Sequence, residues 1–232
     1  MVDIGMIFNC ETTVLVVAAH PDDEVLGVGG TIRRHVNAGA SVHILIVTEG
    51  TTAQYNDAAI IDQKQTQARE SAGILGVGQA GGSIRFGECP DMRLDTLAHT
   101  ELNAVIEDAI EAVDPDIVYT HTASGLNEDH RQIHYSTLVA ARPHSGVMDI
   151  YGYFVGSSTE WAPSTPGFDP HLFVNIDETM QTKIKALECY ATELRPFPHP
   201  RSPKRVREYA AYFGGHVGAR YAEPFEVIRT RR

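Results

Sequence analysis

The chain has 232 residues, of which 43% are hydrophobic and 21% charged, so it is long enough to bury a full core. Its formal net charge of −11 argues against a nucleic-acid backbone as partner, and three widely spaced cysteines indicate neither a disulfide framework nor a thiolate metal site. No apolar run approaches the roughly 18 residues that a membrane span needs. We therefore expect a cytoplasmic protein without a membrane partner, folded as one domain over residues 1–232.

The first predicted element is a strand buried on both faces, at the short apolar and β-branched run 14–19. A helical pattern begins at about Asp22 or Asp23, with Pro21 suited to its first turn, so the polar residues 20–24 lie at a strand-to-helix turn. Open α/β sheets place their active sites at such turns. The segment 20–24 is therefore the first candidate site.

The rest of the chain continues as alternating strands and helices. Further buried strands are predicted at 42–47 and at 118–121, and helical stretches at about 57–76, 98–113, 129–142, 178–193 and 202–213. This alternation predicts a Rossmann-like α/β fold: a single domain with a mostly parallel sheet and helices on both faces. Gly27, Gly29 and Gly30 fall inside the first helix, where they favour close packing on the sheet over nucleotide binding.

Three acids and an imidazole crowd the first turn, at His20, Asp22, Asp23 and Glu24. Helix capping accounts for one acid at most, whereas three neighbouring carboxylates repel one another unless a cation neutralises them. Imidazole and carboxylate ligands without a nearby cysteine favour zinc, with iron(II) or another first-row divalent metal as the alternative.

A second polar group follows the strand at 118–121. Asn127 is a candidate N-cap, which puts His130 near a helix start at the same edge of the sheet, with His134 four residues further on. His20, one of the two aspartates and His130 make the three ligands of an open catalytic metal site, and the other aspartate is left free as a general base. Asp129 is expected to hold a neighbouring group by a hydrogen bond.

The segment 18–30, Ala-Ala-His-Pro-Asp-Asp-Glu-x-x-Gly-x-Gly-Gly, resembles the signature of the LmbE-like (PIG-L) zinc-dependent N-deacetylases. Asn127-x-Asp129-His130-Arg131 supports the resemblance, as do looser likenesses at 90–95, 157–161 and 218–225. The resemblance implies a Rossmann-like fold and the removal of N-acetyl groups from amino sugars and their conjugates. It also implies His20, Asp23 and His130 as metal ligands and Asp22 as the general base.

The family pattern extends to the substrate pocket, with departures. Asn127 stands where many members carry a histidine, and Lys64 and Gln67 replace an arginine and a glutamate; Arg69 is nearby. We take Asn127 and Arg69 as candidate substrate-binding residues. Two further candidates are Glu49 and Asp91, whose carboxylates suit vicinal hydroxyls but also suit a strand-end cap and an Asx turn.

Departure of an amine needs an acid, which Asn127 cannot supply, and histidine is the side chain best suited near neutral pH. The candidates are His121, His134, His144 and His199. We select His199, which three prolines hold in an extended segment, as the second catalytic residue beside Asp22, reaching its own or a neighbouring subunit's metal.

The sequence thus predicts a zinc-dependent hydrolase that removes an acetyl group from a small-molecule N-acetylated amino sugar and forms a homo-oligomer. Two alternatives remain. One is an amidase that cleaves a larger acyl group, and the other a non-catalytic sugar-binding or metal-storage module, which has no use for a free aspartate beside the metal.

Overall fold

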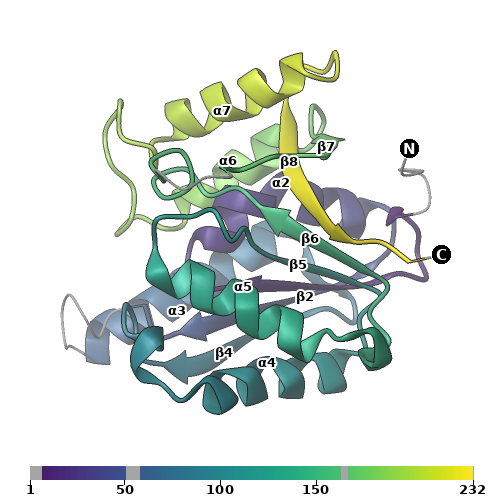
Figure 1. Ribbon diagram of the computed structural model, residues 1–232. Coiled ribbons are helices and arrows are strands. Elements are labelled where there is room, and N and C mark those ends of the chain that lie inside the picture. The colour runs from purple at the N-terminus through teal and green to yellow at the C-terminus, as the bar shows by residue number, and fades with distance from the viewer. Residues whose placement is uncertain (1–6, 51–57, 163–166, 232) are drawn as a thin grey trace.

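The computed structural model describes residues 7–50, 58–162 and 167–231. Within these ranges seven strands form one sheet in the order β4-β2-β1-β5-β6-β8-β7 (Figure 1). The first five are parallel, and β8 and β7 are antiparallel additions at one edge. The strands are β1 Thr13–Ala18, β2 Ser41–Thr48, β4 Ser83–Cys89, β5 Ile117–His121, β6 Asp149–Tyr153, β7 Leu172–Asn175 and β8 Ala222–Arg229; a short strand, β3, covers Val77–Ala80.

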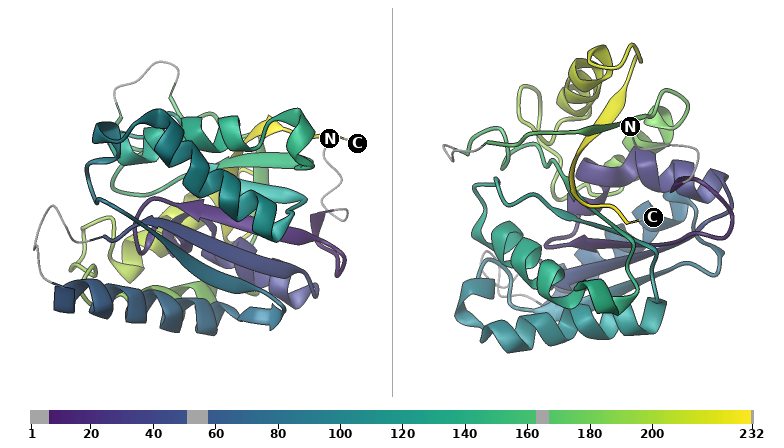
Figure 2. Two further views of the ribbon diagram at one scale, coloured as in Figure 1. Left: turned by 90° about the horizontal axis from the view of Figure 1, so that it is seen from below. Right: turned by 45° about the vertical axis from the view of Figure 1, so that its right-hand side comes forward.

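Helices cover both faces of the sheet. Figures 1 and 2 show α4 and α5 against one face, with α2 and α3 against the other. The helices are α2 Asp23–Asn37, α3 Ala58–Leu75, α4 His99–Val113, α5 Glu128–Ala140, α6 Met180–Glu188 and α7 Pro203–Gly215, and two 3-10 turns cover Leu94–Thr96 and Pro143–Ser145.

Strand β1 contributes to both hydrophobic cores. Val14, Val16 and Ala18 face the core under α2, α3 and α6, whereas Leu15 and Val17 face the core under α4 and α5. This alternation is the two-residue period of a strand buried on both faces, and it explains why the run is apolar throughout. The predicted Rossmann-like α/β fold is confirmed.

Two details differ from the prediction. Helix α2 begins at Asp23, so Pro21 precedes the helix and its N-cap and does not occupy the first turn. The stretch expected to be helical over 178–193 ends at Glu188, because the chain then turns so that the Tyr190 ring packs into the core. Residue 57, the first of another predicted helix, lies outside the described residues. No described helix is both long and apolar enough to cross a bilayer.

Candidate active site

The turn that joins β1 to α2 is fixed by unusual backbone geometry and close packing. Asp22 is the N-cap of α2 with a positive φ of 110°, a region that non-glycine residues rarely adopt. One turn into the helix, a Cβ on Gly27 would lie 2.3 Å from the Tyr153 ring of β6. The absence of a side chain at Gly27 therefore lets α2 approach the sheet, as predicted, and sets the position of the turn.

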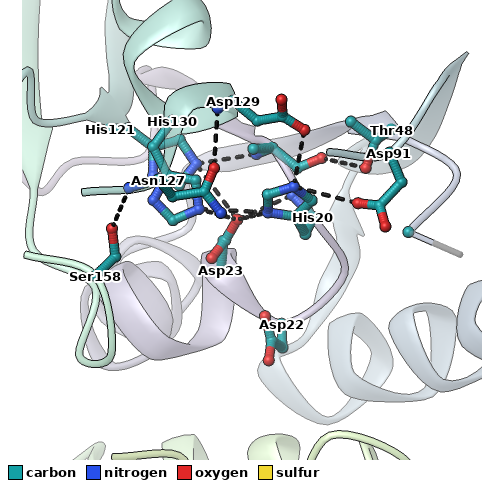
Figure 3. A network of polar contacts seen from close by, with 12 residues as sticks. His20, Asp22, Asp23, Thr48, Asp91, His121, Asn127, Asp129, His130 and Ser158 are labelled. Carbon is teal, nitrogen blue, oxygen red and sulfur yellow. Dashed lines mark hydrogen bonds and ion pairs between the residues drawn. The ribbon is translucent and has the colours of Figure 1, made fainter. Parts of the chain in front are cut away.

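Ring nitrogens from two elements meet the Asp23 carboxylate beside this turn (Figure 3). Oδ2 of Asp23 lies 3.1 Å from Nδ1 of His20 and 3.2 Å from Nε2 of His130, and those two nitrogens are 3.3 Å apart. The other oxygen, Oδ1 of Asp23, is buried and has no hydrogen-bond partner among the described residues. We call these three residues the metal group, since their donor atoms lie close enough together to share one ion.

The second ring nitrogen of His20 faces two other carboxylates. Nε2 of His20 is 3.1 Å from Oδ2 of Asp129 and 3.2 Å from Oδ1 of Asp91, and the backbone N–H of Leu94 donates to Oδ1 of Asp129 at 3.1 Å. A ligating histidine usually donates its free ring N–H to a carboxylate that fixes the ring. Asp129 thus holds a neighbouring group in the way predicted from the sequence.

The charges at the metal group favour a cation. Burial lowers the pKa of His20, but hydrogen bonds to Asp129 and Asp23 and the charges of Asp23 and Asp91 outweigh it and raise that pKa to about 10. For Asp23 burial acts in the other direction and raises the pKa. The nearby His130 and His121 outweigh it and hold the pKa of Asp23 well below its usual range. Three carboxylates, those of Asp23, Asp91 and Asp129, thus surround one imidazole. The residues therefore fit a divalent ion, which would compensate their charge.

The two acids that flank Asp23 have separate environments. Glu24 is fully buried, accepts hydrogen bonds from the Tyr190 hydroxyl at 2.5 Å and the Asp22 N–H at 3.2 Å, and has its pKa raised to about 7 by burial. Asp22 is also fully buried, which raises its pKa well above the usual value against the opposing charge of Arg201. Glu24 is thus tied up in hydrogen bonds, whereas the carboxylate of Asp22 has none among the described residues and pairs by charge with Arg201.

A hollow borders the metal group at His20. Its other lining residues are Lys64, Asp91, Asn127, Glu193 and Arg201, with Pro21, Gly50 and Met92. Two predicted substrate-binding residues, Asp91 and Asn127, lie on its wall. Asn127 also caps α5 as predicted, since its Oδ1 accepts the Asp129 N–H at 2.9 Å. Burial raises the pKa of Asp91, and Nε2 of His20 opposes this.

The other predicted residues are placed outside the hollow. Glu49 is half-buried at the end of β2, where its N–H donates to the Cys89 carbonyl. Arg69 is exposed on α3, with its guanidinium 4.7 Å from the centre of the Phe86 ring. His199 is exposed between α6 and α7, and its described hydrogen bonds stay within residues 196–202.

The remaining histidine candidates for the acid have other contacts. Nε2 of His121 accepts the Ala19 N–H at 2.9 Å, and burial and the neighbouring His130 hold the pKa of His121 well below its usual value. Nδ1 of His134 donates to the His121 carbonyl at 2.8 Å. His144 is exposed in the 3-10 turn that follows α5. Through these contacts His121 and His134 help to hold in place the backbone around the metal group.

Sequence reasoning missed part of the wall of the hollow. Nζ of Lys64 lies 2.7 Å from Oε1 of Glu193, and Arg201 pairs with both Glu193 and Asp22. The sequence did draw attention to Lys64, because this lysine replaces an arginine of the family pattern. Nothing in the sequence pointed to Glu193 or Arg201 except their place beside the proline-rich segment that contains His199.

The comparisons with known proteins agree with this geometry. The PIG-L family model, described as GlcNAc-PI de-N-acetylase, matches residues 15–141. An uncharacterized deacetylase of Escherichia coli, YaiS, is 30% identical over 78% of this chain and 91% of its own length. Diacetylchitobiose deacetylase of Thermococcus kodakarensis is 25% identical over 95% of this chain and 85% of its own.

Solved structures show the same fold in enzymes of two kinds. N,N'-diacetylchitobiose deacetylase from Pyrococcus horikoshii superimposes with a TM-score of 0.75 at 21% identity, covering 94% of this chain and 84% of that one. GalB of Pseudomonas putida, a 4-carboxy-2-hydroxymuconate hydratase, also gives 0.75 at 21% identity, over 95% and 98%. Fold likeness alone therefore does not distinguish the two reactions. The family match covers more than half of the chain and includes the metal group, so the chain belongs to the PIG-L family of N-deacetylases.

Proposed function

We propose that the protein is a zinc-dependent hydrolase that removes an N-acetyl group from an amino-sugar substrate, as a free sugar, glycoside or nucleotide-linked sugar. The observation that carries the proposal is the convergence of Nδ1 of His20, Oδ2 of Asp23 and Nε2 of His130, with a buried Asp22 beside them. Two imidazoles and one carboxylate suit zinc better than the other divalent ions. Zinc bound there supplies Lewis acidity for the amide carbonyl and lowers the pKa of water to about 7.

The residues of the chain then have distinct tasks. Asp22 accepts the proton from the attacking water as general base. Asp129 fixes the ring of His20, and Asp91 offers its carboxylate to sugar hydroxyls at the wall of the hollow. Asn127 has an amide that binds polar substrate groups without transferring a proton.

His199 stays the predicted proton donor to the leaving amine. Because it is exposed, it can reach the hollow only if the segment 191–202 carries it there, within its own chain or from a neighbouring subunit of the expected homo-oligomer. A His199→Ala variant that keeps the wild-type dependence of kcat on pH would exclude it.

The test is acetate release by the zinc-loaded protein across a panel of N-acetylated amino sugars and glycosides, with N-butyryl analogues alongside. We expect acetate from at least one sugar and a fall of roughly a hundred- to ten-thousand-fold in kcat for Asp22→Asn with metal retained. Preference for the butyryl analogues would favour the amidase of larger acyl groups. Hydration of an unsaturated acid without acetate from any sugar would contradict the proposal.

A further inference from the structure

The Asp22 carboxylate lies among like charges. Asp23 and Glu24 follow it in sequence, and Glu193 also acts on it electrostatically. The side chain of Asp22 is 1% exposed, and neither of its oxygens has a hydrogen-bond partner among the described residues. A general base has to point one oxygen at the attacking water, so something must hold this side chain against that repulsion.

Arg201 is the cation that meets this carboxylate. Its Nε lies 2.9 Å from Oδ2 of Asp22, and its side chain is 28% exposed where it lines the hollow. Arg201 comes from the loop between α6 and α7, drawn yellow-green in Figure 1, and is far from Asp22 in sequence. Figure 3 shows Asp22 beside the metal group but outside its network of contacts.

The guanidinium is itself held on several sides. Nη1 of Arg201 lies 3.3 Å from Oε2 of Glu193, and Glu193 pairs with Lys64 of α3, whose Nζ donates to the Gly50 carbonyl at 2.5 Å. The backbone N–H of Arg201 donates to Nδ1 of His199 at 3.1 Å. Charges therefore alternate along Lys64, Glu193, Arg201 and Asp22, and the last contact, between Nε of Arg201 and Oδ2 of Asp22, is an ion pair without hydrogen-bond geometry.

We propose that Arg201 is a positioning residue, which holds the Asp22 carboxylate in the orientation that accepts the proton; this rests on the proposed role of Asp22. A guanidinium suits the task because its planar fork contacts Glu193 and Asp22 at the same time, which the single ammonium of lysine does less well. His199 then also contributes indirectly, because its Nδ1 accepts the backbone N–H of Arg201 and so helps to fix the loop that carries Arg201.

The experiment is a double-mutant cycle on the zinc-loaded protein with Asp22→Asn, Arg201→Ala and both together. We expect Arg201→Ala to lower kcat by about a hundred-fold with little change in KM, since a small misplacement of a catalytic group has an effect of that size. In the Asp22→Asn background it should lower kcat no further. Arg195→Ala is the matched control and should keep kcat near the wild-type value, because this exposed arginine of the same loop hydrogen-bonds, among the described residues, to the backbone carbonyls of Thr192 and Leu194 and not to Asp22.

The outcomes separate two failures. Absence of acetate from every sugar with the wild-type protein would overturn the proposed function, whereas near-normal kcat in Asp22→Asn would overturn the role of Asp22 as the general base and the positioning role with it. A large loss there, together with either normal kcat in Arg201→Ala or a further loss in the double variant, would overturn the positioning role alone. If Arg201→Ala does not fold, Arg201→Lys takes its place. We expect a clear fall in kcat for Arg201→Lys. Wild-type kcat would show that a positive charge at residue 201 is enough and that the planar guanidinium is not needed to orient Asp22.

A second readout does not depend on activity. Melting temperatures of the four metal-free proteins of the cycle report the contact itself, because removal of Arg201 breaks the pair with residue 22 only where that residue is an aspartate. Arg201→Ala should lower Tm more in the wild-type background than in Asp22→Asn. Equal shifts would show that the two side chains do not interact.

Discussion

His20 serves two groups of carboxylates at once, one through each ring nitrogen. Its Nδ1 faces Asp23 and its Nε2 faces Asp91 and Asp129, so a second set of three possible ligands, with Asp91 and Asp129, overlaps the metal group. The two sets differ in chemistry: the first adds a second imidazole, His130, and the second adds only oxygen ligands. Zinc prefers the set with two nitrogens, which leaves Asp129 to orient the His20 ring.

This difference gives a prediction for single variants. His130→Ala should sharply lower the metal content per chain, because it removes one of three ligands, whereas Asp129→Asn should weaken metal affinity only about ten- to hundred-fold. Metal content is measured after dialysis against a weak chelator. His144→Ala, at an exposed histidine, is the control and should keep its metal. Wild-type metal content in both His20→Ala and His130→Ala would refute the assignment.

The sequence predicts this part of the site because its residues obey local rules. His20 and the two aspartates share one turn, and the N-cap at Asn127 places His130 near a helix start, so spacing brings both segments to the same edge of the sheet. The choice of Asp23 over Asp22 as ligand follows from the family resemblance. Arg201 could not be found in this way. Its contact with Asp22 depends on the path of a proline-rich loop, which periodicity does not specify.

Among the elements, three neighbouring strands, β1, β2 and β5, were predicted from the sequence, and the other strands of the sheet were not. β1, β2 and β5 are apolar runs because both faces are buried, whereas β8 contains Glu223, Pro224 and Glu226, a composition that disfavours a strand. Glu223 is buried in spite of its charge because a partner from another element neutralises it. Such pairs depend on tertiary structure and are invisible to a pattern along the chain.

Helix α2 offers a prediction at the level of an element. Gly27→Ala should destabilise the protein by about 1–3 kcal/mol, because the new methyl group would overlap the Tyr153 ring. That ring cannot move aside freely, since its hydroxyl donates to the Val17 carbonyl at 2.9 Å. Chemical denaturation of the metal-free protein measures the change in the free energy of unfolding.

A glycine in another helix supplies the control. Gly73 of α3 has no atom within 4 Å of the place where its Cβ would lie, so Gly73→Ala should stabilise by up to about 1 kcal/mol through helix propensity alone. If Gly27→Ala were also neutral or stabilising, close packing would not be what places the turn at 20–24.

At the scale of the whole molecule, one buried ion pair joins α6 to the last strand, and both of its partners also hydrogen-bond to α2, the helix that begins at the metal group. Nζ of Lys183 in α6 lies 2.5 Å from Oε1 of Glu223 in β8, with side chains 4% and 2% exposed. Nζ also donates to the Leu26 carbonyl at 2.7 Å, and the Glu223 carboxylate accepts the N–H groups of Gly30 and Thr31. The antiparallel edge of the sheet is thereby tied to the middle of α2.

Breaking this pair from one side should be costly. Lys183→Met leaves a buried carboxylate without its counter-charge and should lower the free energy of unfolding by about 3–5 kcal/mol. Adding Glu223→Gln removes that charge while keeping an oxygen for the N–H groups of Gly30 and Thr31, so the double variant should recover part of the loss.

The exposed pair Arg205–Glu208, with side chains 32% and 39% exposed, is the control, and its coupling should not exceed about 1 kcal/mol. Urea denaturation of the metal-free variants gives both couplings. Equal values for the two pairs would mean that the buried pair contributes no more than an exposed one, and the link between β8 and α2 would then rest on the hydrogen bonds of Gly30 and Thr31 to Glu223 and on apolar contacts.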